Sequence, residues 1–189
     1  AGVFRYRTYN DFGEGEESLG DAHSENPHEL LRDAVCELAN RGEACLVFMK
    51  SKHECRHGAF ALARCLSLAP AEDAIEALKQ VETTHSRDAL IETLEYGVAF
   101  HNADLSPAER RIVERAFRRG EARVLVSTST LAVGLNLPAH NVFIAPDKWQ
   151  YDRRFATPWK TPILHAEYEN MSGRAGRFGT NVAFGRSIL

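Results

Sequence analysis

The sequence predicts an α/β fold with a mainly parallel sheet and helices on both faces. Short apolar runs have the length and continuity of buried strands, and segments with helical spacing of apolar residues separate them. Such alternation is typical of β–α–β units in one parallel sheet. The 189 residues, 44% hydrophobic and 26% charged, suffice for one domain of this kind. The four clearest runs are residues 44–49, 97–101, 123–128 and 141–145.

The first two helices have clear start signals. Asn26 is a good N-cap, Pro27 takes the first helical position, and Gly42 ends the segment. Directly after the first apolar run, Ser51 and Glu54 have the spacing of a capping box, which predicts the start of a second helix.

The remaining elements follow in the same way. Residues 72–95 predict two amphipathic helices before the second apolar run. Ser106, with proline and glutamate one and three residues later, predicts a helix that Gly120 ends. A helix at 164–173 and a last strand at 182–189 complete the predicted fold.

The N-terminal segment differs from the rest in composition. Residues 10–25 contain six acidic residues, three glycines and no Lys or Arg, which is typical of a flexible linker or surface loop. We therefore expect residues 1–25 to be an N-terminal segment with an acidic linker, and residues 26–189 to be the folded domain.

Nothing in the sequence points to a membrane or to export. No apolar stretch is long enough to span a bilayer and no secretory signal opens the chain, which predicts a cytoplasmic, intracellular protein. The four cysteines form no C-x-x-C pair and are expected to be reduced. His53 and His57 are four residues apart, but no third ligand is evident, so no metal site is predicted.

The net charge of −3 conceals an asymmetry. Residues 1–104 carry 10 Lys+Arg and 19 Asp+Glu, a balance of −9, whereas residues 105–189 carry 13 and 7, a balance of +6. A basic C-terminal half suggests a polyanionic partner, although a charge-mixed solvated surface explains the same numbers.

The strongest chemical signal is the segment NMSGRAGRFG at 170–179. Arg174 and Arg177 lie three residues apart among glycines that allow close approach of a ligand. Two guanidinium groups so placed can bind one phosphate cluster, as arginine fingers do during phosphoryl transfer. Two surface arginines on a glycine-rich turn are the simpler alternative.

A second signal is STSTLAVGLNLPA at 127–139, which directly follows an apolar run. Its hydroxyls and backbone N–H groups can serve phosphates, but an ordinary strand-to-helix loop explains it equally well. A third segment, 100–128, is compatible with plain α/β architecture.

Together, these segments resemble one family. Their order and spacing are similar to the C-terminal, second RecA-like motor domain of superfamily-two DExH-box helicases of the superkiller-like group. The resemblance covers nearly the whole chain and implies a three-layer RecA-like fold. The matching segments are ACLVFMKSK at 44–52, HNADLS at 101–106, STSTLAVGLNLPA at 127–139 and NMSGRAGR at 170–177.

The resemblance implies roles for matched positions. Arg174 and Arg177 would be the catalytic arginine fingers. The residues expected on the ATP side are Gly134, Asn136, Asn170 and Gly173. The residues expected to contact nucleic acid are Lys50, Ser51, His101, Thr128, Trp149, Tyr151, Arg153 and Arg154.

Two positions depart from the family pattern. Asn170 stands where the family usually has Gln, and its shorter side chain puts a direct nucleotide contact in doubt. Asp104 stands where Gly is common, and it either places a negative charge near the nucleic-acid track or adds to the capping of the next helix.

Residues 146–163 interleave aromatic and cationic side chains, a combination that suits base stacking beside a phosphate backbone. In the resembled family a β-hairpin in this interval separates the duplex strands, and we expect the same here. An aromatic mini-core beneath a long loop is the alternative.

The chain lacks the G-x-x-x-x-G-K-[ST] phosphate loop and an acidic Mg²⁺ motif, which the resembled family carries on a preceding domain. The sequence therefore predicts half of an ATP-dependent helicase or translocase that acts on DNA or RNA and is inactive when isolated. ATP and Mg²⁺ would be held mainly by the absent first domain. A non-catalytic nucleic-acid- or protein-binding module is the alternative.

Overall fold

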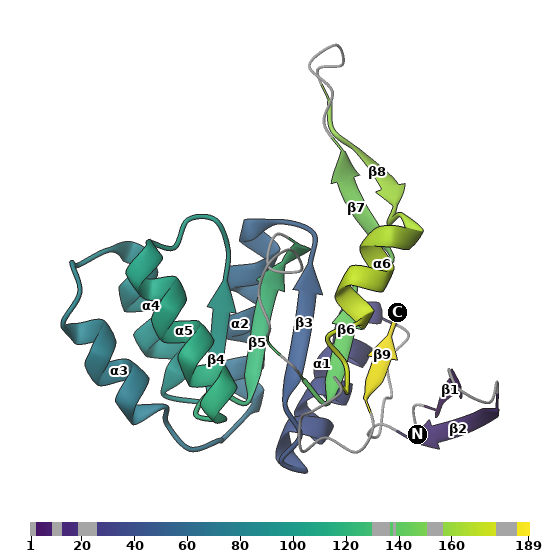
Figure 1. Ribbon diagram of the computed structural model, residues 1–189, viewed down its shortest axis with the longest axis horizontal. Coiled ribbons are helices and arrows are strands. Elements are labelled where there is room, and N and C mark those ends of the chain that lie inside the picture. The colour runs from purple at the N-terminus through teal and green to yellow at the C-terminus, as the bar shows by residue number, and fades with distance from the viewer. Residues whose placement is uncertain are drawn as a thin grey trace.

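A computed structural model of the chain describes residues 3–8, 13–18, 26–129, 137, 139–150, 157–176 and 185–189. Its centre is a five-stranded sheet in the order β4-β5-β3-β6-β9, in which every neighbouring pair is parallel (Figure 1). These strands are β3 (Cys45–Met49), β4 (Val98–His101), β5 (Val124–Thr128), β6 (Asn141–Ile144) and β9 (Arg186–Ile188). The predicted parallel α/β sheet is confirmed.

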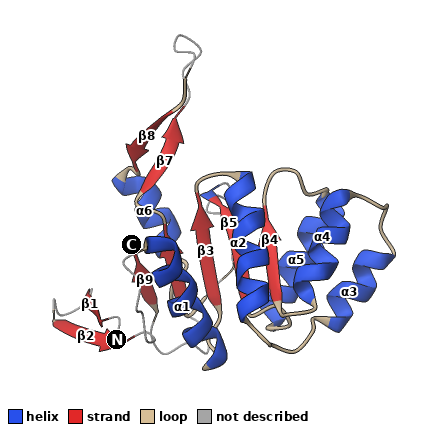
Figure 2. Ribbon diagram, turned by 180° about the vertical axis from the view of Figure 1, so that it is seen from behind, coloured by secondary structure: helices blue, strands red, loops and turns tan. Residues whose placement is uncertain are grey.

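Helices cover both faces of this sheet, as the three-layer prediction requires. Helices α1 and α2 lie on one face and α5 and α6 on the other, while α3 and α4 lie beyond the β4 edge (Figures 1 and 2). The helices are α1 (Pro27–Asn40), α2 (Lys52–Cys65), α3 (Glu72–Lys79), α4 (His85–Leu94), α5 (Pro107–Arg119) and α6 (His165–Ser172).

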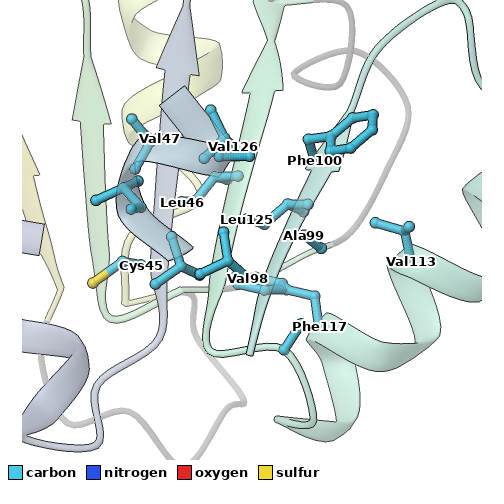
Figure 3. Close-up of a cluster of buried hydrophobic side chains, with 14 of the residues drawn as sticks. Cys45, Leu46, Val47, Val98, Ala99, Phe100, Val113, Phe117, Leu125 and Val126 are labelled. Carbon is cyan, nitrogen blue, oxygen red and sulfur yellow. The ribbon is translucent and has the colours of Figure 1, made fainter. Parts of the chain in front are cut away.

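The core lies between the strands and these helices. All five residues of β5 are buried because neighbouring strands flank it and helices cover the sheet. From α5, Val113 and Phe117 point toward the strands and pack with Val98 and Leu125 (Figure 3). Burying each such side chain contributes about 1.5–3 kcal/mol, so the apolar runs read from the sequence account for most of the driving force.

The predicted helix caps form as expected, except that one hydrogen bond at the start of α2 involves a neighbouring residue. Ser106 and Glu109 form the full capping box of α5, and Gly120 ends that helix at φ 76°. At α2, Ser51 Oγ accepts from the Glu54 amide at 3.1 Å, but the Glu54 carboxylate accepts from the amide of Lys50, not of Ser51, at 3.2 Å. The residue before the cap is thereby fixed as well.

The predicted N-terminal linker is wrong for residues 14–18. These residues form β2 (Glu14–Ser18), which pairs antiparallel with β1 (Val3–Arg7). Glu17 on β2 receives two hydrogen bonds from Arg186 at 2.7 and 2.8 Å. Composition alone suggested a loop because both the partner strand and the anchoring arginine lie elsewhere in the chain. A domain boundary at residue 25 stays a prediction.

Candidate nucleotide and nucleic-acid site

The carboxyl ends of β3 and β5 lie side by side and carry three of the predicted nucleic-acid residues. Met49 pairs with Thr128 in the parallel register, so Lys50 and Ser51 follow β3 at the same edge where β5 ends in Thr128. Ser51 and Lys50 are partly exposed, whereas Thr128 is 9% exposed. Ligands bind at this edge of open α/β sheets, and the structure brings the three residues together there.

His101 ends the neighbouring strand β4, but its side chain is 5% exposed. Its Nε2 lies 3.2 Å from Glu114 Oε1 on α5. Burial lowers the pKa of His101, against the opposing effect of Glu114. The ring therefore packs between β4 and α5, and the prediction of a nucleic-acid contact at His101 gains no support from its placement.

Asp104 does not contribute to capping α5, which the Ser106–Glu109 box supplies. Its exposed carboxylate instead pairs with Lys52 at the start of α2. The structure therefore contradicts the alternative in which Asp104 adds to the capping of α5.

The two most specific sequence motifs meet in space. The end of the 127–139 segment and the turn after α6 are joined by a parallel bridge between Ala139 and Ala175. Ala139 N donates to the Arg174 carbonyl at 3.0 Å, and Gly176 N donates to the Ala139 carbonyl at 2.9 Å. Gly176 adopts φ 52°, a conformation that favours glycine. The backbone from the Arg174 carbonyl to the Gly176 amide is thus fixed against the neighbouring motif.

The groups around this turn fit a polyphosphate. Asn170 and Gly173 are exposed at the end of α6, and Arg174 is partly exposed. Guanidinium, amide and backbone N–H groups are donors that bind phosphate oxygens. Among the described residues no cluster of three or more His, Cys, Asp or Glu could hold a metal ion. Donors of this kind can bind the phosphate groups of a nucleotide.

Several predicted residues lie outside the described part of the chain. They are Arg177, Gly134, Asn136, Tyr151, Arg153 and Arg154. Their roles stay predictions. Within the described helices, no segment is both long and apolar enough to cross a membrane.

The interval 146–163 contains the expected β-hairpin. Its strands β7 (Asp147–Gln150) and β8 (Trp159–Pro162) pair antiparallel and project beyond the carboxyl edge of the sheet (Figure 1). Trp149 and Trp159 are 45% and 36% exposed, and Lys160 lies 5.4 Å from the Trp149 ring centroid. These two rings do not form a buried mini-core, so that alternative is excluded for them.

Ion pairs that sequence reasoning missed fix the base of this hairpin. Lys148 Nζ bonds both carboxylate oxygens of Glu167 on α6, at 2.6 and 2.7 Å. Lys50 pairs with Asp147, and this contact lowers the pKa of that carboxyl. Both pairs border a shallow pocket between the sheet edge, the hairpin and α6. No spacing rule reveals such pairs, because their members lie on different elements.

Sequence comparisons assign the chain to a known family. Residues 28–179 match the family described as helicase conserved C-terminal domain. The chain is 37% identical over 183 residues to the ATP-dependent DNA helicase Hel308 of Methanocella arvoryzae, an alignment that covers 93% of this chain and 24% of that protein. Hel308 of Pyrobaculum calidifontis is 38% identical over 162 residues, covering 82% and 22%. Hel308 of Caldivirga maquilingensis is 34% identical over 186 residues, covering 90% and 23%.

A five-stranded parallel sheet with helices on both faces, in which a glycine–arginine turn is bridged to the residue 127–139 segment, defines an α/β domain of the RecA-like class. The chain belongs to the helicase C-terminal domain family. It spans about a quarter of the length of these Hel308 relatives.

Proposed function

We propose that this chain is the second motor domain of an ATP-dependent DNA helicase of the superkiller-like DExH-box group. The observation that carries the proposal is the bridge between Ala139 and Ala175, which fixes the Arg174 backbone beside the residue 127–139 segment. DNA is the preferred substrate over RNA because the relatives named above are DNA helicases.

In this proposal the chain contributes cationic side chains and contacts to the DNA backbone. A first motor domain contributes the phosphate loop and the Mg²⁺ site. ATP would supply the free energy that drives closure of the two domains. Arg174 and Arg177 would stabilise the negative charge that develops on the transferred phosphoryl group. Thr128, Ser51 and Lys50 would hold the DNA backbone at the carboxyl edge of the sheet, so closure would shift the DNA by steps, in the 3′ to 5′ direction that the family resemblance implies.

The hairpin would separate the two DNA strands ahead of these backbone contacts. The exposed Trp149 ring can stack on a nucleobase. The ion pairs at the foot of the hairpin would transmit force to the sheet. Replacing Trp149 and Tyr151 with alanine is expected to lower duplex unwinding more than ATP hydrolysis. Equal loss of both activities would contradict the strand-separating role.

The deciding experiment measures steady-state ATP hydrolysis by the longer polypeptide that includes the first motor domain, with and without single-stranded DNA or RNA. Arg174→Ala should reduce DNA-stimulated hydrolysis by about a thousandfold or more, the range known for arginine fingers. Arg41→Ala, which removes an exposed arginine that pairs with Glu37 on α1, should hydrolyse normally. The isolated chain should not hydrolyse ATP.

Undiminished hydrolysis in a folded Arg174→Ala variant would refute the role of this arginine. Absence of hydrolysis by the longer polypeptide with either nucleic acid would favour a helicase-derived binding module instead. Stimulation by RNA alone would correct the assigned substrate.

A further inference from the structure

Helix α5 carries a row of three arginines that the proposed motor chemistry does not use. Arg111, Arg115 and Arg118 are all exposed. Their spacing of four and three residues places them on one face of the helix, over an axial length of about 10 Å. The opposite face of α5 is apolar and packs into the core through Val113 and Phe117 (Figure 3). The row is therefore held on a rigid, core-anchored support.

Within the described part of the chain, these arginines lack the ion pairs that neutralise several other arginines. Arg119, on the same helix, lies 3.8 Å from both Asp73 and Glu121. By contrast, no carboxylate among the described residues pairs with Arg111, Arg115 or Arg118. Like charges spaced four residues apart destabilise a helix, so the row costs folding stability. The three arginines are present despite this destabilisation, so we expect an anion from outside the domain to neutralise their charge.

The composition around the row favours a phosphate backbone over a protein partner. Protein interfaces have an apolar, aromatic-rich centre with a polar rim. Among the described residues, none of the exposed large hydrophobic side chains lies on α5. Binding of a nucleic-acid backbone needs no apolar centre, because its affinity comes from neutralised phosphates and released counterions. Arginine also binds phosphate through two parallel N–H donors.

The position of α5 connects the row to the carboxyl edge, which carries Lys50, Ser51 and Thr128. The helix begins a few residues after His101, at the carboxyl edge, and runs toward the opposite edge (Figure 1). Arg111 lies nearest to that edge and Arg118 farthest from it. Nucleic acid that leaves the edge on the β4 side would meet the three cations in succession.

We propose that Arg111, Arg115 and Arg118 form a second nucleic-acid contact that binds the phosphodiester backbone outside the motor cleft. It extends the binding surface from the carboxyl edge onto the flank of the domain. The contact is independent of ATP and of base sequence. It can therefore be tested separately from the proposed motor function.

The test uses the 189-residue chain itself and fluorescence anisotropy with a fluorescein-labelled 20-nucleotide DNA strand or its duplex. The triple variant Arg111→Gln/Arg115→Gln/Arg118→Gln should bind at least about tenfold more weakly at about 50 mM salt. The slope of log affinity against log salt should fall by about 2 for the single strand, or by about 3 for the duplex, if all three residues contact phosphates. The form of DNA that shows the larger loss identifies the ligand.

A matched triple variant controls for net charge. Arg32→Gln/Arg41→Gln/Arg64→Gln removes the same charge from α1, from the residue that follows α1 and from α2, on the opposite face of the sheet. It should change the affinity less than twofold, within the usual error of the assay. The α5 variant should melt at or above the temperature of the unsubstituted chain, because it relieves repulsion within the helix.

Three outcomes would overturn the proposal. They are unchanged binding by the α5 variant, equal losses in both triple variants, and absence of binding by the unsubstituted chain at low salt. Loss of ATP hydrolysis by the Arg174→Ala variant of the longer protein bears on the motor function alone.

Discussion

At the scale of single residues, Gly185 decides how the last strand meets the arginine-bearing turn. A Cβ at Gly185 would lie 2.1 Å from Gly176 N and 2.4 Å from the carbonyl carbon of Ala175. These are backbone atoms that already bond to the neighbouring motif, so they cannot move away cheaply. The next residue, Arg186, bonds the His140 carbonyl at 2.8 Å and starts β9. Only glycine allows the turn and the strand to approach this closely.

We therefore expect Gly185→Ala to lower the free energy of unfolding by about 1–3 kcal/mol, the usual cost of forcing extra volume into a packed site. Urea unfolding followed by circular dichroism measures this change. In the longer protein, the same substitution should reduce ATP hydrolysis because it displaces the turn that carries Arg174.

Gly58→Ala is the matched control for this prediction. A Cβ there would lie 3.0 Å from the terminal methyl of Met49, a flexible side chain that can move, and Gly58 lies inside α2. Alanine inside a helix is favoured over glycine by about 0.5–1 kcal/mol. The same chemical change should thus be neutral or stabilising at 58 and destabilising at 185. Equal effects at both positions would contradict the proposed clash.

At the scale of elements, the hairpin β7–β8 and the helix α6 act as one unit because a two-pronged ion pair joins them. Glu167 accepts both from Lys148 and from the amide of Leu164, at 2.8 Å, so one carboxylate caps α6 and anchors β7. The hydrogen bond from Lys148 is the main reason that the pKa of Glu167 lies below its ordinary value. A force on the hairpin is therefore transmitted to the helix that precedes Arg174.

Acid should loosen this unit before it melts the sheet. A carboxylate with a lowered folded-state pKa contributes its stability fully above the ordinary value of about 4.3, and that stability is lost as the pH falls through the folded-state pKa. Both tryptophans of the chain, Trp149 and Trp159, lie in the hairpin, so their fluorescence reports on it alone. Circular dichroism at 222 nm, the usual helix signal, reports on the rest of the fold.

We expect Lys148→Met to shift the acid transition of tryptophan fluorescence to higher pH, because Glu167 then titrates closer to its ordinary pKa. The loss at neutral pH should be at most about 1 kcal/mol, since about a third of each side chain is exposed, 32% and 35%. Lys79→Met, which breaks an ion pair with Glu76 on α3, should leave the fluorescence transition unchanged. Identical transitions in both variants would mean that Lys148 does not anchor the hairpin.

At the scale of the whole molecule, the sequence predicts what depends on local pattern and misses what depends on tertiary partners. Continuous apolar runs give β3, β4, β5 and β6 because only buried parallel strands tolerate them. Strand β2 was missed because its acidic residues are typical of a loop until Arg186 and Arg41 are placed beside Glu17.

The candidate site likewise contains residues that local motifs predict and contacts that depend on tertiary packing. Arg174 and Thr128 are predicted from motifs, since a motif and its local backbone are encoded within a few residues, and their roles stay predictions. The burial of His101 against Glu114 depends on how α5 packs on β4, which no single segment specifies. The same is true of the pairing of Lys148 with Glu167. Pairwise contacts between distant elements require the assembled sheet.

The buried cysteines test whether this sheet and its helices unfold as one cooperative unit. Cys45 on β3 and Cys55 on α2 are fully buried, and burial raises the pKa of each thiol to about 12. Cys65 at the end of α2 is exposed. Because the thiolate is the reactive form and reagents need access, Cys65 should react rapidly in the native state. Cys45 and Cys55 should react only through global opening, at least about a thousandfold more slowly.

Mass spectrometry after timed labelling with a thiol reagent assigns each rate. Both slow rates should rise together with urea, with the same dependence as the unfolding transition seen by circular dichroism, because β3 and α2 belong to one core. A Cys65→Ser variant should lose the fast phase and keep the slow ones. If Cys55 instead reacted faster than Cys45 with a weaker urea dependence, α2 would open separately from the sheet. The carboxyl-edge residues Lys50 and Ser51, which link the two, would then belong to a locally mobile site.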